Sequence, residues 1–271
     1  MSITAFRPIL LFASALLVCC ASGTLAHADE IRIGGTGSAT ELLRQLAEGF
    51  AKEGDGRVDV IPSLGSSGAI RAVSDGALDL AVSGRPLKPE EKKSGLVVDL
   101  IARTPFVIAT SHPKPNGLKT AALLEAFSSK SGAWSDGEPI RIILRPRSES
   151  DTALMGEMFP GLASAIEGAR KRPEVPTAAI DQDNLEMAEK LRGSLVGSTL
   201  TQIILEKRSL QMVAIDGVAP TLENFERGSY PYFKSLYFVL LTTPNPATKR
   251  FIEFLRSTEG LKLLREAAVI L

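Results

Sequence analysis

The fold of this 271-residue chain is decided by four short loops rich in glycine and hydroxyl side chains: Gly34-Gly35-Thr36-Gly37-Ser38-Ala39-Thr40, Gly65-Ser66-Ser67-Gly68, Ser83-Gly84-Arg85 and Arg145-Pro146-Arg147-Ser148-Glu149-Ser150-Asp151-Thr152. Each loop follows an apolar, strand-like run, and at least the first two precede a helical pattern. One such loop is an ordinary helix cap. Four that meet would place helix starts, hydroxyl groups and arginines around an oxyanion.

The segments around the first three loops predict an α/β fold. Strand patterns at 31–33, 58–61 and 78–82 alternate with helical patterns at 40–51 and 69–75. This alternation is typical of mostly parallel sheets, in which ligands bind beyond the carboxyl ends of the strands. The first three loops lie at that position.

The rest of the chain predicts two strands that cross between lobes. The first is the apolar run at 97–109, which ends in a turn cluster at 110–117, and the second is the apolar run at 236–242. Between them we expect helices at 120–127, 151–159, 162–171 and 183–191, with a strand at 140–144. One amphipathic helix is predicted at 251–268.

The first 28 residues have the pattern of a secretory signal peptide. Arg7 is their only charged residue, 9–18 is apolar, and Ala26-His27-Ala28 fits cleavage after Ala28. A lipoprotein anchor at Cys19 or Cys20 is the alternative, although neither cysteine follows the small residue that lipidation prefers. We therefore expect a protein of the periplasm.

Composition excludes several other classes. Cleavage would leave 243 residues with 30 basic and 31 acidic side chains, which predicts no attraction to nucleic acid or membrane surfaces. Both cysteines would leave with the leader, and His112 would be the remaining histidine. No metal site and no cofactor are therefore expected. A hydrolase built on Ser66 is the enzyme alternative, but it would need His112, which we expect in an exposed turn beside Pro113.

The ordered motifs resemble those of the phosphate-binding proteins of bacterial ABC importers. The first three loops are similar to that family's, with Pro86-Leu87 after the third, and Thr104-Pro105-Phe106-Val107-Ile108-Ala109 resembles its crossover strand. Ser150-Asp151-Thr152 stands where the family has Ser-Gly-Thr. Two later stretches also resemble family segments: Gly193-Ser194-Leu195-Val196-Gly197, and 216–225 followed by Gly228-Ser229-Tyr230-Pro231.

The resemblance implies a two-lobed type II periplasmic binding protein with two crossover strands as the hinge. Lobe I would comprise 29–108 and 237–271, and lobe II would comprise 109–236. It further implies a monomeric, non-enzymatic protein that captures inorganic phosphate, or a similar tetrahedral oxyanion, and delivers it to ABC permease subunits. A periplasmic sensor or accessory protein that binds the same anion is the alternative.

The resemblance also implies the ligand-binding residues. Either arginine of the fourth loop can reach the anion, and we favour Arg145 because it directly follows a strand. The full set is Ser38, Ala39, Thr40, Ser66, Ser67, Gly68, Gly84, Arg85, Arg145, Arg147, Ser150, Asp151 and Thr152.

One paired departure from the family concerns the proton of hydrogen phosphate. The family commonly has an aspartate after the serine of the third loop, and it accepts that proton. This chain has Gly84 there, and it has Asp151 where the family has glycine. We therefore expect Asp151 to replace the missing acceptor from the opposite lobe.

Overall fold

The computed structural model describes residues 30–54 and 56–271. The predicted signal peptide, with the alternative lipid anchor, lies outside the described residues. No helix in the described ranges combines the length and the apolar character needed to cross a bilayer.

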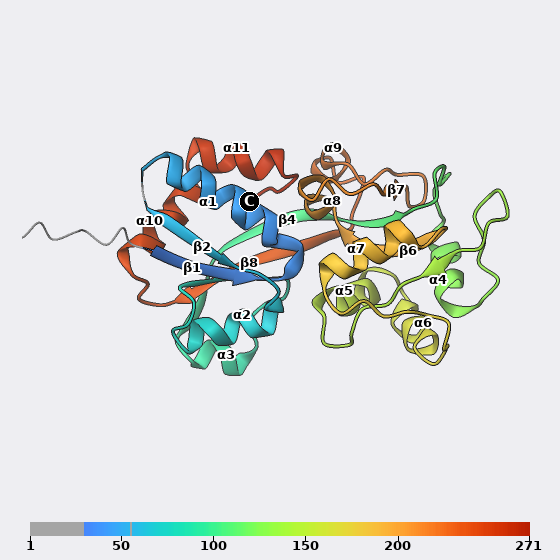
Figure 1. Cartoon of the computed structure of the whole chain (residues 1–271), viewed down its shortest axis with the longest axis horizontal. Coiled ribbons are helices and arrows are strands. Elements are labelled where there is room, and N and C mark those ends of the chain that lie inside the picture. Colours follow the sequence, from blue (N-terminus) through green and yellow to red (C-terminus); the bar gives the residue numbers. More distant parts are fainter. Residues whose placement is uncertain (1–29, 55) are drawn as a thin grey trace, which may run out of the picture.

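The described chain folds into alternating strands and helices that run between two halves of an elongated molecule (Figure 1). The elements are, in order, β1 (Glu30–Gly35), η1 (Gly37–Ala39), α1 (Thr40–Lys52), β2 (Arg57–Ile61), α2 (Gly65–Ser74), β3 (Leu80–Ser83), α3 (Pro89–Lys93), β4 (Leu96–Thr110), α4 (Thr120–Ser128), β5 (Arg141–Ile142), α5 (Ser150–Met158), α6 (Leu162–Ala169), α7 (Asp181–Lys190), β6 (Ser194–Thr199), α8 (Leu200–Leu205), β7 (Gln211–Val213), α9 (Leu222–Glu226), β8 (Phe233–Leu241), α10 (Pro246–Leu255) and α11 (Thr258–Glu266).

The strands form a sheet path in the order β2-β1-β3-β8-β4-β6-β5, with β7 paired to β4. β1 is parallel to both β2 and β3, and β5 is parallel to β6, as the alternating pattern predicted. The antiparallel pairs all involve β4 or β8. Consecutive parallel strands are joined through helices, which places the loops after β1, β2 and β3 at one end of the sheet.

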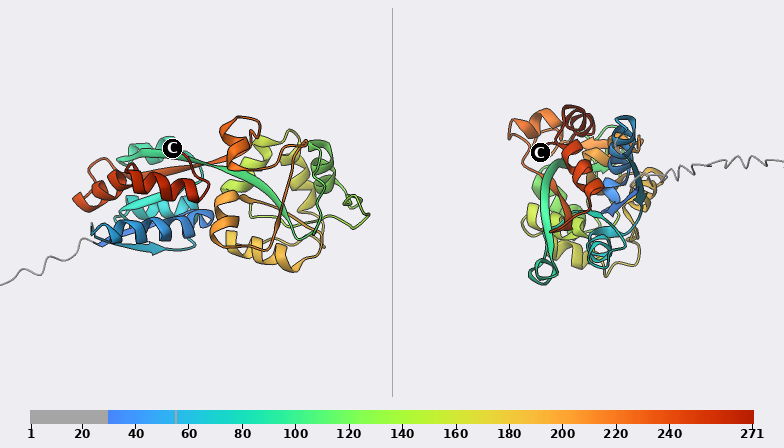
Figure 2. Two further views of the ribbon diagram at one scale, coloured as in Figure 1. Left: turned by 90° about the horizontal axis from the view of Figure 1, so that it is seen from above. Right: turned by 90° about the vertical axis from the view of Figure 1, so that its left-hand side faces the viewer.

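β4 and β8 connect the two halves, as predicted for the crossover strands. The first ten residues of β4, Leu96–Pro105, pair with β8, and the residues from Phe106 onward pair with β6 and β7. Figures 1 and 2 show both strands running from one half into the other.

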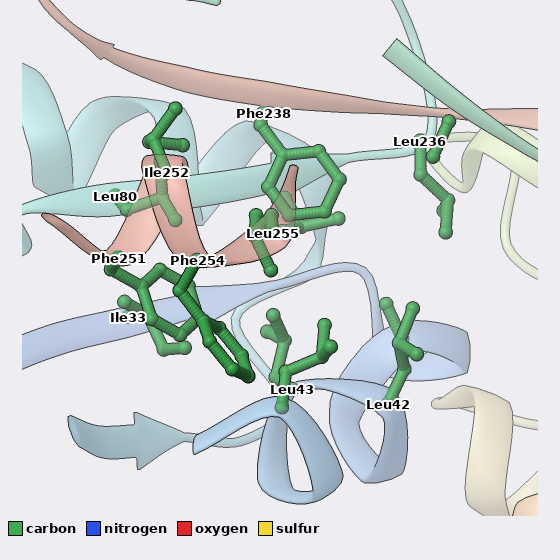
Figure 3. Packing of buried hydrophobic residues seen from close by; sticks show 14 of the residues in the cluster. Ile33, Leu42, Leu43, Leu80, Leu236, Phe238, Phe251, Ile252, Phe254 and Leu255 are labelled. Carbon is green, nitrogen blue, oxygen red and sulfur yellow. The ribbon is translucent and has the colours of Figure 1, made fainter. Parts of the chain in front are cut away.

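The two halves of the molecule have different buried apolar clusters. One cluster packs α1, α10 and α11 against β1, β3 and β8, and Figure 3 shows its centre around Phe238, Phe251 and Leu255. The largest cluster of the middle segment runs from Phe106 to Tyr230 and includes Trp134 and Phe159. The lobe division at 108/109 and 236/237 stays a prediction.

The predicted C-terminal helix is two helices in the structure. α10 ends at Leu255 and α11 begins at Thr258, because the Ser257 side chain accepts a hydrogen bond from Gly260 N and so starts a new helix. Periodicity alone missed this break, since the apolar spacing continues across it.

Candidate functional site

A fully buried lysine lies at the centre of the loops that the sequence singled out. Lys234, on β8, has no exposed surface. Its Nζ donates to Thr36 Oγ1 at 3.1 Å, to Ser38 Oγ at 3.0 Å and to a carboxylate oxygen of Asp151. Three donor directions thus meet three acceptors, which is the full capacity of an ammonium group. Because Thr36 and Ser38 follow β1 while Asp151 lies on α5, Lys234 joins the two halves of the molecule.

The close approach of Lys234 explains why residue 84 is glycine. A Cβ on Gly84 would lie 2.5 Å from Lys234 Cε and 2.7 Å from Ser150 Oγ. Any side chain there would overlap these atoms. The paired departure at positions 84 and 151 therefore has one physical cause: Lys234 fills the space beside residue 84, and Asp151 neutralises its charge.

A second buried acidic group, Asp181, lies beside this pair at the start of α7. Arg145 Nη2 is 3.5 Å from Asp181 Oδ1 and 3.3 Å from Glu149 Oε2. Burial, and then the charge of Asp151, raise the pKa of Asp181 to about 6, against the opposing charges of Lys234 and Arg145. Asp181 therefore keeps its proton to a higher pH than an exposed aspartate does.

The loops also enclose an open cavity, which we call the α2–α5 pocket. It has a volume of about 180 Å³ and is lined by Leu64, Gly65, Ser66, Ser67, Gly68, Arg85, Ser148, Glu149 and Ser150. α2 begins at Gly65 and α5 at Ser150, and neither helix start receives a side-chain cap within the described chain. Their first N–H groups are thus available to an anion, which helix dipoles also favour.

The arginines differ in what they contact. Arg85 lines the α2–α5 pocket, where it donates to Ser67 Oγ at 3.0 Å and pairs with both oxygens of Glu91 at 2.7 and 2.8 Å. This pairing lowers the pKa of Glu91. Arg145 is buried, whereas the Arg147 side chain is 71% exposed and forms a forked pair with Glu167 on the surface.

Three other residues predicted to bind the ligand do not line the α2–α5 pocket and contact other parts of the protein. Thr152 Oγ1 donates to Pro146 O at 3.0 Å and so closes the fourth loop. Ala39 N bonds Thr36 O at 3.0 Å, and Thr40 begins α1 and lines a separate pocket beside Arg44. The structure thus brings Ser66, Ser67, Gly68, Arg85 and Ser150 together around one cavity.

Sequence reasoning missed Lys234, although a signal was available. In the first six residues of β8, Lys234, Leu236 and Phe238 are buried, whereas Phe233, Ser235 and Tyr237 are only partly buried. Side chains on a strand alternate between its faces, so a lysine in register with Leu236 and Phe238 points inward. It also missed Asp181, because acidic residues at a helix start are ordinary surface features.

His112 was expected in an exposed turn, and this was wrong: it is 2% exposed. Its ring stacks on Trp134 with centroids 5.0 Å apart, because the turn folds back over the middle segment. Nδ1 faces the Lys114 N–H at 3.3 Å, so in the neutral ring Nε2 carries the hydrogen and donates to Asp136 at 3.0 Å. Glu138 completes a group with metal-ligand spacing, but a cation on Nε2 would move the ring hydrogen to Nδ1, where it would face the Lys114 N–H.

Replacing Lys234 with methionine should destabilise the protein by about 3–5 kcal/mol, because the buried Asp151 carboxylate would lose its counter-charge. Chemical denaturation measures this change. Lys190→Met is the matched control, since Lys190 pairs with Glu186 on the surface and its loss should cost less than about 1 kcal/mol. Equal costs for the two variants would contradict the role given to Lys234.

Gly84→Ala should destabilise by about 1–3 kcal/mol, because its methyl group overlaps Lys234 and Ser150. Gly168→Ala is the control: it lies in α6, and a Cβ there meets no described atom within 4 Å. A helical alanine is favoured over glycine by about 0.5–1 kcal/mol. Thermal or urea unfolding should therefore show shifts of opposite sign.

Asp181→Asn should change the pH dependence of stability. The raised pKa means that the folded protein holds a proton that the unfolded chain has released between about pH 4 and 6, so the wild type loses stability as pH rises through that range. The Asn variant lacks this loss, so its stability relative to wild type should rise by about 2 kcal/mol from pH 4 to pH 7. Urea titrations at several pH values measure the difference, and a falling difference would contradict the assignment.

Comparison with known proteins agrees with this architecture. A substrate-binding protein of Clostridium perfringens, solved with bound phosphate, has 21% sequence identity and a TM-score of 0.76, covering 89% of this chain and 99% of that one. An ABC-type phosphate transport receptor from Vibrio cholerae has 18% identity and a TM-score of 0.62, with 89% and 99% coverage. These likenesses show a fold of the two-lobed type II periplasmic binding proteins.

A curated relative is the phosphate-binding protein PstS 2 of Streptococcus pneumoniae, 34% identical over 106 residues. The match spans 39% of this chain and 36% of the relative's length. The resemblance seen in the loop motifs is confirmed by these similarities. The model of the PBP superfamily domain matches residues 21–259, which is most of the sequence, and the chain therefore belongs to that family.

Proposed function

We propose that this chain is a solute-binding protein that captures inorganic phosphate, or a similar tetrahedral oxyanion, in the α2–α5 pocket and delivers it to the permease of an ABC importer. In this role it works in the periplasm as a monomer and catalyses no reaction. The family match and the phosphate-binding relatives support the proposal.

The α2–α5 pocket is the observation that carries the proposal. Two helix starts without side-chain caps face a cavity of about 180 Å³, and Arg85 and four serines stand in its wall. A cavity of this size holds several water molecules and so accommodates four oxygen atoms around one centre. N–H groups, hydroxyl groups and a guanidinium are the donors that such an oxyanion requires.

We further propose that the pocket opens and closes as the two lobes move about β4 and β8. Residues 29–108 with 237–271 form lobe I in this proposal, and 109–236 form lobe II. Ser66 and Arg85 would then approach from lobe I, and Ser148 and Ser150 from lobe II. Lys234 and Asp151 both fall in lobe II by this division, so the bonds from Lys234 Nζ to Thr36 and Ser38 would hold the two lobes together in the closed state.

The acceptor for the proton of hydrogen phosphate is Glu149 in this proposal. Asp151 had been expected in that role, but its carboxylate bonds Lys234 and it is not among the residues that line the pocket. Glu149 lines the pocket, and its carboxylate oxygen Oε2 lies 3.3 Å from Arg145 Nη2. It can accept a hydrogen from hydrogen phosphate, whereas sulfate has none to offer at neutral pH.

Calorimetry on refolded, ligand-free protein tests the proposal with phosphate, sulfate, arsenate and molybdate. Phosphate should bind more tightly than sulfate, and Glu149→Gln should reduce this preference by about tenfold or more, since hydrogen bonds to charged groups are worth about 1.5–3 kcal/mol. Glu157→Gln removes the same charge from α5 at a position that does not line the pocket and should keep the preference.

If none of the four anions binds, oxyanion capture is wrong. If the preference for phosphate survives in Glu149→Gln, capture stands and the role of Glu149 falls.

A further inference from the structure

We infer that the bound oxyanion carries an apolar organic substituent, so that the ligand class is phosphate monoesters or phosphonates with a small neutral group. The inference rests on the proposed function, because it assumes that the phosphoryl end occupies the α2–α5 pocket. It adds a second compartment, which we call the side groove: a cavity of about 460 Å³ that borders β8 and α5.

One wall of the side groove is the outward face of β8. Phe233, Ser235 and Tyr237 all line it, and they alternate with the inward Lys234 and Leu236. Strand geometry requires this division, since successive side chains leave opposite faces. The same alternation that buries the lysine therefore turns two aromatic rings toward an open space.

The opposite wall is one face of α5. Ser150, Ala153, Leu154, Glu157 and Met158 line the groove. Their spacing of three and four residues places them on a single helix face. Ala153 is exposed, and Leu154 and Met158 are only partly buried, although all three are apolar. An apolar helix face left open beside two aromatic rings is suited to cover by an apolar ligand group.

The side groove adjoins the α2–α5 pocket. Arg85, Ser148, Glu149 and Ser150 line both cavities, so a ligand held by its phosphoryl group at these residues can extend directly along α5. The residues of β8 and α5 that line the side groove extend it away from Arg85 and Ser150. Free phosphate would fill only the smaller compartment and leave the larger one to water.

The charges at the groove indicate a neutral substituent. The Arg147 guanidinium is already paired with Glu167, and the Arg85 guanidinium with Glu91. Glu157 lies on the exposed side of α5 and would repel a second negative group. What remains for the substituent is contact with the side chains of Leu154, Met158, Phe233 and Tyr237, which favours an aryl or short alkyl group.

Calorimetry with inorganic phosphate, methyl phosphate, phenyl phosphate and phenylphosphonate tests the inference on refolded, ligand-free protein. It is run at about pH 5, below the second pKa of about 6 of a phosphate monoester, so that each ester keeps the hydrogen that Glu149 is proposed to accept. Phenyl phosphate should bind at least about tenfold more tightly than inorganic phosphate, because the ring buries apolar surface in the groove. Ala153→Trp should fill the groove and abolish this gain, while inorganic phosphate keeps its affinity within about twofold. Ala121→Trp, at an exposed position of α4, is the matched control and should behave as wild type.

The outcomes separate the two proposals. If inorganic phosphate binds and the esters bind no more tightly, the organic ligand class is overturned and oxyanion capture stands. If Ala153→Trp weakens phosphate and phenyl phosphate equally, the groove does not hold the substituent and the inference is again overturned. If neither phosphate nor any ester binds, both proposals fail.

Discussion

A lysine ammonium with no access to water is the constraint on which the centre of this protein depends. Transfer of such a charge out of water is costly unless opposite charge and hydrogen-bond acceptors surround it. Lys234 obtains them from Thr36 and Ser38 after β1 and from Asp151 on α5, residues far apart in sequence. Only the arrangement in which the two halves of the molecule meet satisfies all three bonds. β4, β8 and the loops must therefore assemble so that Lys234 can form these three bonds.

The same lysine limits where an external anion could bind under the proposed function. Its side chain fills the space beside Gly84, and Asp151 already supplies the negative charge that a bound anion would otherwise bring to the Lys234 ammonium. The open donors are next to it, at the starts of α2 and α5. The four loops that the sequence singled out therefore divide between two tasks: part of the set neutralises an internal charge, and part surrounds a cavity.

Local pattern was sufficient for the fold and for half of the site. Apolar pattern located α1, β4 and α5 within one or two residues, and α1 has the continuous buried face that such a pattern predicts. Helix starts rich in serine marked Ser66 and Ser150 for the same local reason. The roles of Arg85 and Arg147 depend on Glu91 and Glu167, and no local pattern reveals which acidic residue will face a given arginine. The buried position of Lys234 could have been predicted from the sequence, since strand alternation alone places its side chain on the inward face.

Three acidic groups surround this centre, Asp151, Asp181 and Glu149, against the two cations Lys234 and Arg145. The raised pKa of Asp181 reports the result: burial and its acidic neighbour outweigh the nearby cations, and a proton is held more tightly there than in water. A fully ionised dianion in the α2–α5 pocket would likewise be repelled by Glu149, which lines that pocket. An oxyanion that brings its own hydrogen lowers that repulsion and gives Glu149 a donor. Under the proposed function, the electrostatics would thus favour a phosphoryl group over sulfate through proton content, not through a surplus of positive charge.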